Sequence, residues 1–223
     1  MTSFRGKRKG NAWTDRITCR LLVPDGIRRH QKRVMRDKIA RSMTTFFRFF
    51  ADAFFGERYG HRALVLETVA GVPGMVGGML THLYSLRRLK RGHGTMIHEL
   101  LAEAENERKH LMFFMEIVQP SRLERFIIVV AQFIFWHYYL FLYMFFPKTA
   151  HLMVSYFEEE AVRSYTSYLQ LIQEGKIEDI PAPQIAIDYY GLMQSARLSH
   201  MIVQVRNDEM NHMKANRRYS NAL

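Results

Sequence analysis

Two Glu-x-x-His pairs occur in the sequence, one in EAENERKHLM and the other in RNDEMNHMK. At this i, i+3 spacing the carboxylate and the imidazole project from the same face of a helix, with their Cβ atoms about 5–6 Å apart. A helical bundle that supplies two such pairs, and one further Glu from each of two other helices, provides the six ligands of a carboxylate-bridged di-iron site. Glutamates without a histidine three residues later occur in LETVAGVPGM and in YFEEEAV. The predicted metal ligands are Glu67, Glu107, His110, Glu158, Glu209 and His212.

One Glu-x-x-His pair alone would be weak support, because Glu and His are common on solvated helix faces and short motifs match by chance. The second pair changes this interpretation, and so do the surroundings of Glu158. The run of three glutamates at 158–160 follows Ser-Tyr-Phe and precedes Ala-Val. Burying a carboxylate is costly unless a cation or hydrogen bonds compensate it, and a metal ion is the simplest compensation. An oxygen-rich donor set with imidazole favours iron or manganese over a thiolate-type site.

The charge of the chain indicates an anionic partner. The 223 residues, enough for one domain with a sizeable core, carry a net charge of +11 and have a pI near 9.9. The basic residues concentrate in the first part of the chain and alternate there with aromatic-rich apolar segments. This arrangement fits an anionic lipid surface. No helix-turn-helix, zinc-finger or RNA-binding signature accompanies the charge, so nucleic acid is not an expected partner.

Cys19 is the only cysteine, which excludes intrachain disulfides and thiolate metal sites. The opening of the chain is basic and has few acidic residues, and it lacks the apolar core of a signal peptide. We therefore interpret residues 1–40 as a basic cytosolic arm, residues 41–219 as a di-iron helical domain, and residues 220–223 as a C-terminal tail.

Gly/Pro punctuation and helical periodicity predict an all-α fold. The expected helices cover residues 41–55, 62–88, 95–118, 126–146, 148–174 and 184–217. The second, third, fifth and sixth of these carry the ligands and form a ferritin-like antiparallel four-helix bundle, with two apolar helices outside it. The GVPGMVGGM stretch in the second helix lets another backbone approach closely. It predicts a tight helix contact or a dimer seam.

Two segments indicate contact with a membrane. Residues 126–146 contain no charged residue and are long enough to span a bilayer. Their polar aromatic residues lie at the middle rather than at the ends, which is unlike an aromatic belt. The phenylalanines of residues 41–55 gather on one face beside many cations, which fits a helix lying in the interface. From these residues, spanning and insertion into one leaflet both remain open.

The stretches HRALVLETVAGVPGM, EAENERKHLM, YFEEEAVRSYT and NDEMNH resemble the alternative oxidases, the cyanide-insensitive di-iron quinol oxidases of respiratory membranes. The similarity extends over residues 48–216 and implies two iron ions held by the six residues named above. It also implies that Tyr165 takes part in electron and proton transfer beside the metals. Residues matched to positions that orient the ligands are Asn106, Asp208 and Tyr189, those matched to the quinol site are Arg62 and Ser164, and His151 matches a family histidine near the site.

The resemblance implies a ubiquinol oxidase that reduces dioxygen to water without pumping protons. It further implies a homodimer inserted into one leaflet of an inner membrane, on the cytoplasmic face in a bacterium or the matrix face in a mitochondrion. The short N-terminal part resembles bacterial members, and Cys19 does not align with the regulatory cysteine of plant members. Two alternatives remain open, a di-iron quinone-biosynthesis hydroxylase and a non-catalytic ferritin-like iron binder. The quinone pool and any regulation are not predicted.

Overall fold

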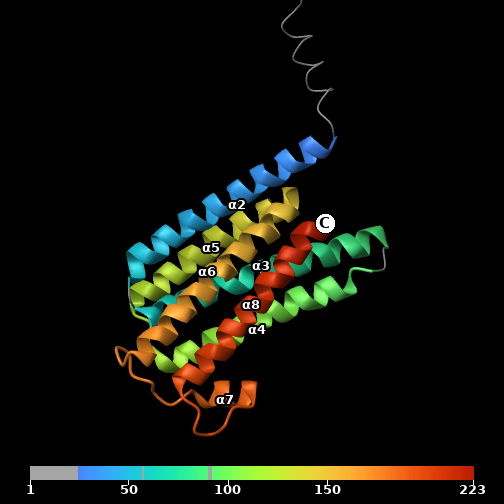
Figure 1. Ribbon diagram of the computed structural model, residues 1–223. Coiled ribbons are helices and arrows are strands. Elements are labelled where there is room, and N and C mark those ends of the chain that lie inside the picture. The colour runs from blue at the N-terminus through green and yellow to red at the C-terminus, as the bar shows by residue number, and fades with distance from the viewer. Residues whose placement is uncertain (1–24, 57, 90–91) are drawn as a thin grey trace, which may run out of the picture. The chain divides into compact units, whose positions relative to one another are not determined.

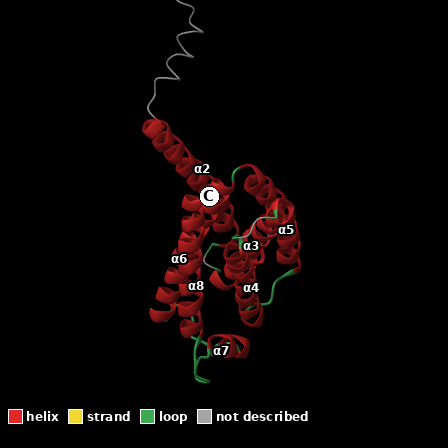
Figure 2. Ribbon diagram, turned by 90° about the vertical axis from the view of Figure 1, so that its right-hand side faces the viewer, coloured by secondary structure: helices red, strands yellow, loops and turns green. Residues whose placement is uncertain are grey.

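The chain forms helices that are long and closely spaced in sequence (Figures 1 and 2). The computed structural model describes residues 25–56, 58–89 and 92–223. Among them no strand occurs, and the only extended pairing is an isolated bridge between Pro181 and Arg197. The predicted all-α class is therefore confirmed. The helices are α2 (Asp25–Phe55), α3 (Tyr59–Arg88), α4 (Gly94–Ile117), α5 (Arg122–Phe145), α6 (Pro147–Gln173), α7 (Gln184–Tyr190) and α8 (Leu198–Ala222).

Contacts between residues divide the chain into two units, residues 1–38 and residues 39–223. The second unit holds every predicted site residue, and the description below concerns that unit. Cys19 and positions 1–24 of the predicted basic arm lie outside the described residues. The remainder of that arm is helical and belongs to α2.

Two antiparallel helix pairs hold the predicted ligands. The main contacts join α3 to α4 and α6 to α8, and α5 packs on both α3 and α6. One core cluster contains Leu64 of α3 and Tyr165 of α6, and a second contains Val72 of α3 and Val154 of α6. Along α3 and α6, the predicted ligand lies between the residues of the two clusters. The apolar packing on either side of the ligands thus holds the four helices at the level where the carboxylates meet.

Gly74 sets the distance between α3 and α4. A Cβ atom at this position would lie 2.4 Å from the backbone oxygen of Leu100 and 3.0 Å from the Cβ of Ala104. No side chain fits there, so the two backbones touch directly, and the tight helix contact predicted from GVPGMVGGM is confirmed. Pro73 lies inside α3 without ending the helix.

Several helix boundaries differ from the prediction, among them the end of α8, which continues to Ala222 rather than ending at residue 217, so that most of the predicted C-terminal tail is helical. Helix α2 begins at Asp25 rather than at residue 41, so the polar and basic stretch before the phenylalanines is helical as well. Helix α5 begins at Arg122 because Ser121 and Glu124 form a capping box ahead of the apolar run. The single helix expected over residues 184–217 is wrong. It is divided into α7 and α8 because Gly191 adopts a φ of 62° and ends α7.

Within the described residues, two helices are long and apolar enough to cross a membrane, α3 and α5. The most apolar window of α3 is 56% buried inside the fold, as is usual for a core helix, whereas that of α5 is only 22% buried. Phe126, Phe133 and Phe145 of α5 are 65–67% exposed. The outer face of α5 is thus an unusually apolar surface, and length and composition alone are weak grounds for a span.

Candidate metal centre

The six predicted ligands meet inside the bundle. Their donor atoms form two groups. Within each group, all the donor atoms lie within 4.8 Å of one another. The first contains Glu67 and His110 and the second contains Glu158 and His212, and both groups include Glu107 and Glu209. Two adjacent sites that share two carboxylates are the arrangement expected of a carboxylate-bridged pair of metal ions.

The ligands come from four helices and are largely removed from solvent. Helix α3 supplies Glu67, α4 supplies the first Glu-x-x-His pair, α6 supplies Glu158 and α8 supplies the second pair. The four glutamates are 1–6% exposed and His110 is fully buried, whereas the His212 side chain is 12% exposed. The i, i+3 spacing places each imidazole beside its own glutamate, as the sequence predicts.

Glu107 and Glu209 each face both imidazoles. The Nδ1 atom of His110 lies 3.2 Å from Glu209 and 3.6 Å from Glu107, and also 3.6 Å from Glu67. The Nδ1 atom of His212 lies 2.8 Å from Glu107 and 3.5 Å from Glu209. These two carboxylates therefore occupy the centre of the cluster, and Glu67 and Glu158 occupy its two ends.

The donor set fits a metal because its inward-facing atoms lack hydrogen bonds. Buried polar groups in proteins nearly always have a partner, so a concentration of exceptions at one point calls for an explanation. The buried donor atoms of this cluster lie close to one another, but none of those named next forms a hydrogen bond with a described residue. They are Oε2 of Glu67, both carboxylate oxygens of Glu107 and of Glu209, and Nδ1 of His110 and of His212.

Burial and neighbouring charges shift the pKa values of the cluster strongly. Burial raises the pKa of Glu67 and Glu158 well above the ordinary range, and neighbouring carboxylates add to this effect. Burial acts in the same direction on Glu107, but the two nearby imidazoles outweigh it and hold its pKa well below the ordinary value. Burial lowers the pKa of His110 and His212, but acidic neighbours outweigh it and raise both pKa values well above the usual range. A buried cluster with this many carboxylates requires positive charge at its centre.

A second layer of hydrogen bonds fixes the His110 ring. Its Nε2 atom lies 3.0 Å from the hydroxyl of Tyr190 and 3.3 Å from Asp208, and the Tyr190 hydroxyl donates to Asp208 at 2.8 Å. Asn106 donates to Asp208 at 3.1 Å and to the hydroxyl of Tyr189 at 2.9 Å. With Nε2 engaged, Nδ1 is directed at the cluster. Three of these residues were candidates from the sequence, and Tyr190 was not, because only the turn after α7 brings it to the histidine.

Tyr165 contacts the cluster of candidate ligands directly. Its hydroxyl donates a hydrogen bond to Oε1 of Glu67, and its ring stacks on Phe114 with centroids 5.9 Å apart. The side chain is 5% exposed, and burial followed by the charge of Glu67 raises its pKa well above the ordinary value. The phenol is thus kept protonated, with its proton directed at a predicted ligand.

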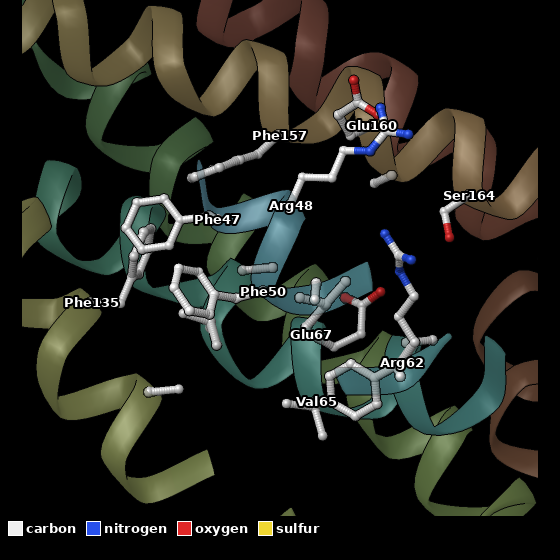
Figure 3. Close-up of a pocket in the computed structure, with 18 of the residues that line it drawn as sticks. Phe47, Arg48, Phe50, Arg62, Val65, Glu67, Phe135, Phe157, Glu160 and Ser164 are labelled. Atoms are coloured by element: carbon white, nitrogen blue, oxygen red, sulfur yellow. The ribbon is translucent and has the colours of Figure 1, made fainter. Parts of the chain in front are cut away.

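An apolar cavity of about 580 Å³ extends to the cluster (Figure 3). Its walls are mainly phenylalanine and aliphatic side chains of α2, α3, α5 and α6, and they include the carboxylates of the cluster and Tyr165. Arg62 and Ser164, the predicted quinol-site residues, both line it, and in Figure 3 their side chains point toward one another. The Nη1 atom of Arg62 pairs with Asp52 at 2.5 Å, while its buried Nε atom has no hydrogen-bond partner among the described residues.

The other acidic and histidine candidates do not belong to the cluster of candidate ligands. Glu159 pairs with Arg163 at 2.6 Å, and Glu160 pairs with Arg48 at 2.8 Å, so neither faces the metal site. His151 is fully buried in a separate network with Asn216 and Tyr143. Of the three consecutive glutamates, the helix turns only Glu158 inward.

A family model described as alternative oxidase matches residues 24–221. The chain belongs to the alternative oxidase family.

Among similar proteins, the mitochondrial ubiquinol oxidase of Batrachochytrium dendrobatidis is 50% identical over 187 residues, which are 84% of this chain. Alternative oxidase 3 of Glycine max, also mitochondrial, is 47% identical over 192 residues, and ubiquinol oxidase 1a of Oryza sativa is 48% identical over 192 residues, in each case 86% of this chain. The matched part covers 59%, 59% and 58% of these relatives, so the chain spans somewhat less than three fifths of their length. The resemblance seen in the four sequence stretches is therefore confirmed for the family.

Proposed function

We propose that this alternative oxidase family member is a membrane-bound ubiquinol oxidase that transfers electrons to dioxygen and forms water. The observation that carries the proposal is the apolar cavity whose inner wall is the carboxylate cluster. An apolar substrate entering this cavity comes directly against the predicted metal ligands. The names of the similar proteins, ubiquinol oxidases among them, support the same assignment.

The cofactor of the proposal is a pair of iron ions. Glu107 and Glu209 would bridge the two, because each faces both imidazoles. Glu67 with His110 and Glu158 with His212 would complete one site each. Bound iron supplies the one-electron steps that quinol and oxygen cannot readily perform together. The hard carboxylate oxygens suit iron in its oxidised state.

Arg62, Ser164 and Tyr165 act on the substrate side. The unpartnered Nε–H of Arg62 and the hydroxyl of Ser164 face the cavity and are available to the oxygens of a quinol head group. Tyr165 holds a proton at the Oε1 atom of Glu67, so the phenol can give one electron toward the reduction of dioxygen, pass that proton to the carboxylate at the same time, and regain both from quinol. Two quinols release four electrons and four protons, which balance the reduction of one dioxygen to two waters.

The proposed location is one leaflet of an inner membrane, where quinol is dissolved. The apolar outer face of α5 and the exposed phenylalanines of α2, including Phe46, Phe49 and Phe50 at 56–66% exposure, fit insertion into the acyl region. The net charge of +11 fits an anionic lipid surface. A homodimer and attachment without a complete span are part of the same proposal. Labelling from both sides of sealed vesicles tests it, and the two ends of α5 appearing on opposite sides would show that α5 spans.

The deciding experiment is oxygen uptake by purified, iron-loaded protein with a short-chain quinol, with and without cyanide. We expect cyanide-resistant uptake with one dioxygen consumed for two quinols, and only oxidised quinone as the organic product. Hydroxylated quinone would instead identify the quinone-biosynthesis reaction, and iron binding without uptake would identify an iron-binding protein.

A pair of arginine variants separates substrate binding from metal binding. Arg62→Ala should reduce quinol turnover with both irons retained, because only contacts to the substrate and to Asp52 are lost. Arg108→Ala is the control, since Arg108 is exposed and pairs with Glu105. Equal turnover of the two variants would remove Arg62 from the quinol site.

A further inference from the structure

A buried carboxylate outside the metal cluster lies where the ends of three helices meet. Glu124 is in the first turn of α5 and is 3% exposed. Its Oε1 atom lies 2.9 Å from Nδ1 of His61, in the first turn of α3, and 3.6 Å from Nη1 of Arg58, which directly precedes α3. The Nη2 atom of Arg58 donates to the backbone oxygen of Phe54, at the end of α2, at 3.1 Å. Arg58, His61 and Glu124 thus form a cluster, the Glu124 cluster, that joins α2, α3 and α5.

The two oxygens of Glu124 face different helices. Oε2 accepts from the backbone nitrogen of Ser121 at 2.7 Å and completes the capping box of α5. Oε1 forms no hydrogen bond in good geometry with a described residue, so His61 and Arg58 act on it by charge. Burial raises the pKa of Glu124, but the Ser121 hydrogen bonds and these two charges outweigh burial and hold the pKa below its ordinary value. The carboxylate is therefore ionised, with one oxygen directed at its own helix and the other at the start of α3.

The same helix ends form one end of the apolar cavity. The lining residues at this end are Phe54 and Phe55 of α2, Tyr59 and Arg62 of α3, and Phe126 of α5. Phe54 is 38% exposed and Phe126 is 65% exposed, so the cavity reaches the protein surface here. The guanidinium of Arg58 lies 5.8 Å from the ring centroid of Phe54 and 5.9 Å from that of Phe55. The Glu124 cluster therefore contacts the cavity wall directly.

Arg62 is positioned by the same start of α3. It directly follows His61 and pairs with Asp52 of α2. The turn that joins α2 to α3 contains Gly56 with a φ of 53°, a conformation that glycine adopts readily. A shift of the start of α3 relative to α5 would therefore move the predicted quinol-site arginine and the end of α2 together. The attraction between His61 and Glu124 opposes that shift.

We propose that Glu124 is a positioning residue for quinol binding, whose carboxylate acts through Arg58 and His61 to hold the helix ends at the surface end of the cavity. The inference rests on the proposed function, since it takes the substrate of the cavity to be a quinol. Glu124 itself contacts no substrate and takes no part in electron transfer. The role requires the charge of the carboxylate rather than its part in the capping box. Its loss should weaken substrate binding and leave the chemical step unchanged.

Glu124→Gln tests the role because it removes the charge and keeps the capping box, in which glutamine replaces glutamate. We expect the KM for a short-chain quinol to rise about tenfold, equivalent to about 1.4 kcal/mol, with kcat and iron content unchanged. A rise in KM at constant kcat identifies lost substrate binding rather than lost chemistry. Glu116→Gln, the same change at an exposed position of α4, is the control and should behave as wild type.

Two further variants separate the charge from the helix cap. Ser121→Ala removes the side-chain cap of α5 and keeps the charge of Glu124, so stability should fall while KM changes less than in Glu124→Gln. The double variant Arg58→Gln/Glu124→Gln should have a KM close to that of Glu124→Gln, because both changes remove the same contact. Independent effects would multiply instead.

Two measurements need no quinol oxidation. Amide hydrogen exchange of iron-loaded protein should be faster in Glu124→Gln over residues 58–63, where the start of α3 loses its contact with α5, and unchanged around the metal ligands. Equilibrium dialysis with the oxidised short-chain quinone should show binding about tenfold weaker than in the wild type.

Several results would overturn the inference. Wild-type KM and wild-type exchange in Glu124→Gln would show that the charge positions nothing, and loss of iron or an equal fall in kcat would make the residue part of the general fold. A KM rise in Ser121→Ala as large as that in Glu124→Gln would assign the effect to the helix cap. If Glu124→Gln failed to fold, unchanged KM in both Arg58→Gln and His61→Gln would overturn the inference. Weaker quinone binding and faster exchange in Glu124→Gln, with a wild type that does not oxidise quinol, would contradict the proposed function alone.

Discussion

The two Glu-x-x-His pairs are alike in sequence and differ in their surroundings. His110 is fully buried, and Tyr190 and Asp208 hold its outer nitrogen. His212 is 12% exposed, and its helix continues one turn to Asn216, which donates to the carboxylate of Glu103. The first half of the cluster also includes Tyr165, bonded to Glu67, whereas the second half includes Glu158. Equal spacing thus produces similar ligand geometry, and long-range contacts determine what each half can do.

Removing a shared ligand should have the largest effect. In Glu107→Ala we expect both irons and all turnover to be lost, because Glu107 faces both imidazoles. Glu67→Ala and Glu158→Ala each remove a ligand from one group only and should bind about one iron per chain. Metal analysis of the purified variants measures this. Equal iron loss in all three variants would show that the two halves do not bind independently.

Tyr165→Phe should separate chemistry from metal binding in the first half. The change deletes only the phenolic oxygen that donates to Glu67, so the helical fold and both irons should remain while turnover collapses. Circular dichroism, iron content and oxygen uptake on the same preparation test this. Tyr168→Phe, one turn later on α6, is the matched control. A Tyr165→Phe protein with the wild-type rate would exclude the phenol from the reaction.

Asp208→Asn tests whether the first half depends on its outer hydrogen bonds. Loss of the negative charge behind His110 should weaken iron binding about 10- to 100-fold, the range seen for such supporting groups. Competition with a chelator measures the affinity, and Asp188→Asn on the exposed face of α7 is the control. Unchanged affinity would mean that the ring is held by packing alone.

Tyr190→Phe should have the smallest effect. It removes one hydroxyl from a network in which Asp208 still reaches His110, at a cost of about 1 kcal/mol. That corresponds to roughly a fivefold loss in iron affinity, since about 1.4 kcal/mol is tenfold in an equilibrium constant. A loss as large as that of Asp208→Asn would show that the tyrosine, rather than the carboxylate, orients the histidine.

The convergence of the six candidate ligands could be predicted because its signal is local. Two residues at i, i+3 share a helix face whatever surrounds them, and the apolar context of the glutamate run indicated burial. That Glu158 rather than Glu159 or Glu160 faces inward depends on the rotation of α6 in the bundle. Glu158 was predicted from its sequence context and again from the resemblance, and its burial agrees.

The features that were missed depend on contacts between distant residues. The end of α7 at Gly191 lies within an otherwise helical pattern, and the bridge between Pro181 and Arg197 that closes the loop joins positions with no shared motif. Tyr190 reaches His110 only because of that loop. In the sequence, nothing distinguishes Glu103 from other acidic residues of α4. Its hydrogen bond from Asn216 of α8 is seen only in the folded structure.

The contact at Gly74 has a consequence for how this site can vary among sequences. Backbone atoms of α3 and α4 touch there, with 2.4 Å between a hypothetical Cβ and the Leu100 oxygen. The distance from Glu67 to the α4 ligands is therefore fixed by main chain, which does not change when core side chains are exchanged. Apolar residues around the cluster can change in size and shape while the spacing between these candidate ligands stays constant. A single methyl group at position 74 would alter that spacing more than many substitutions elsewhere in the core.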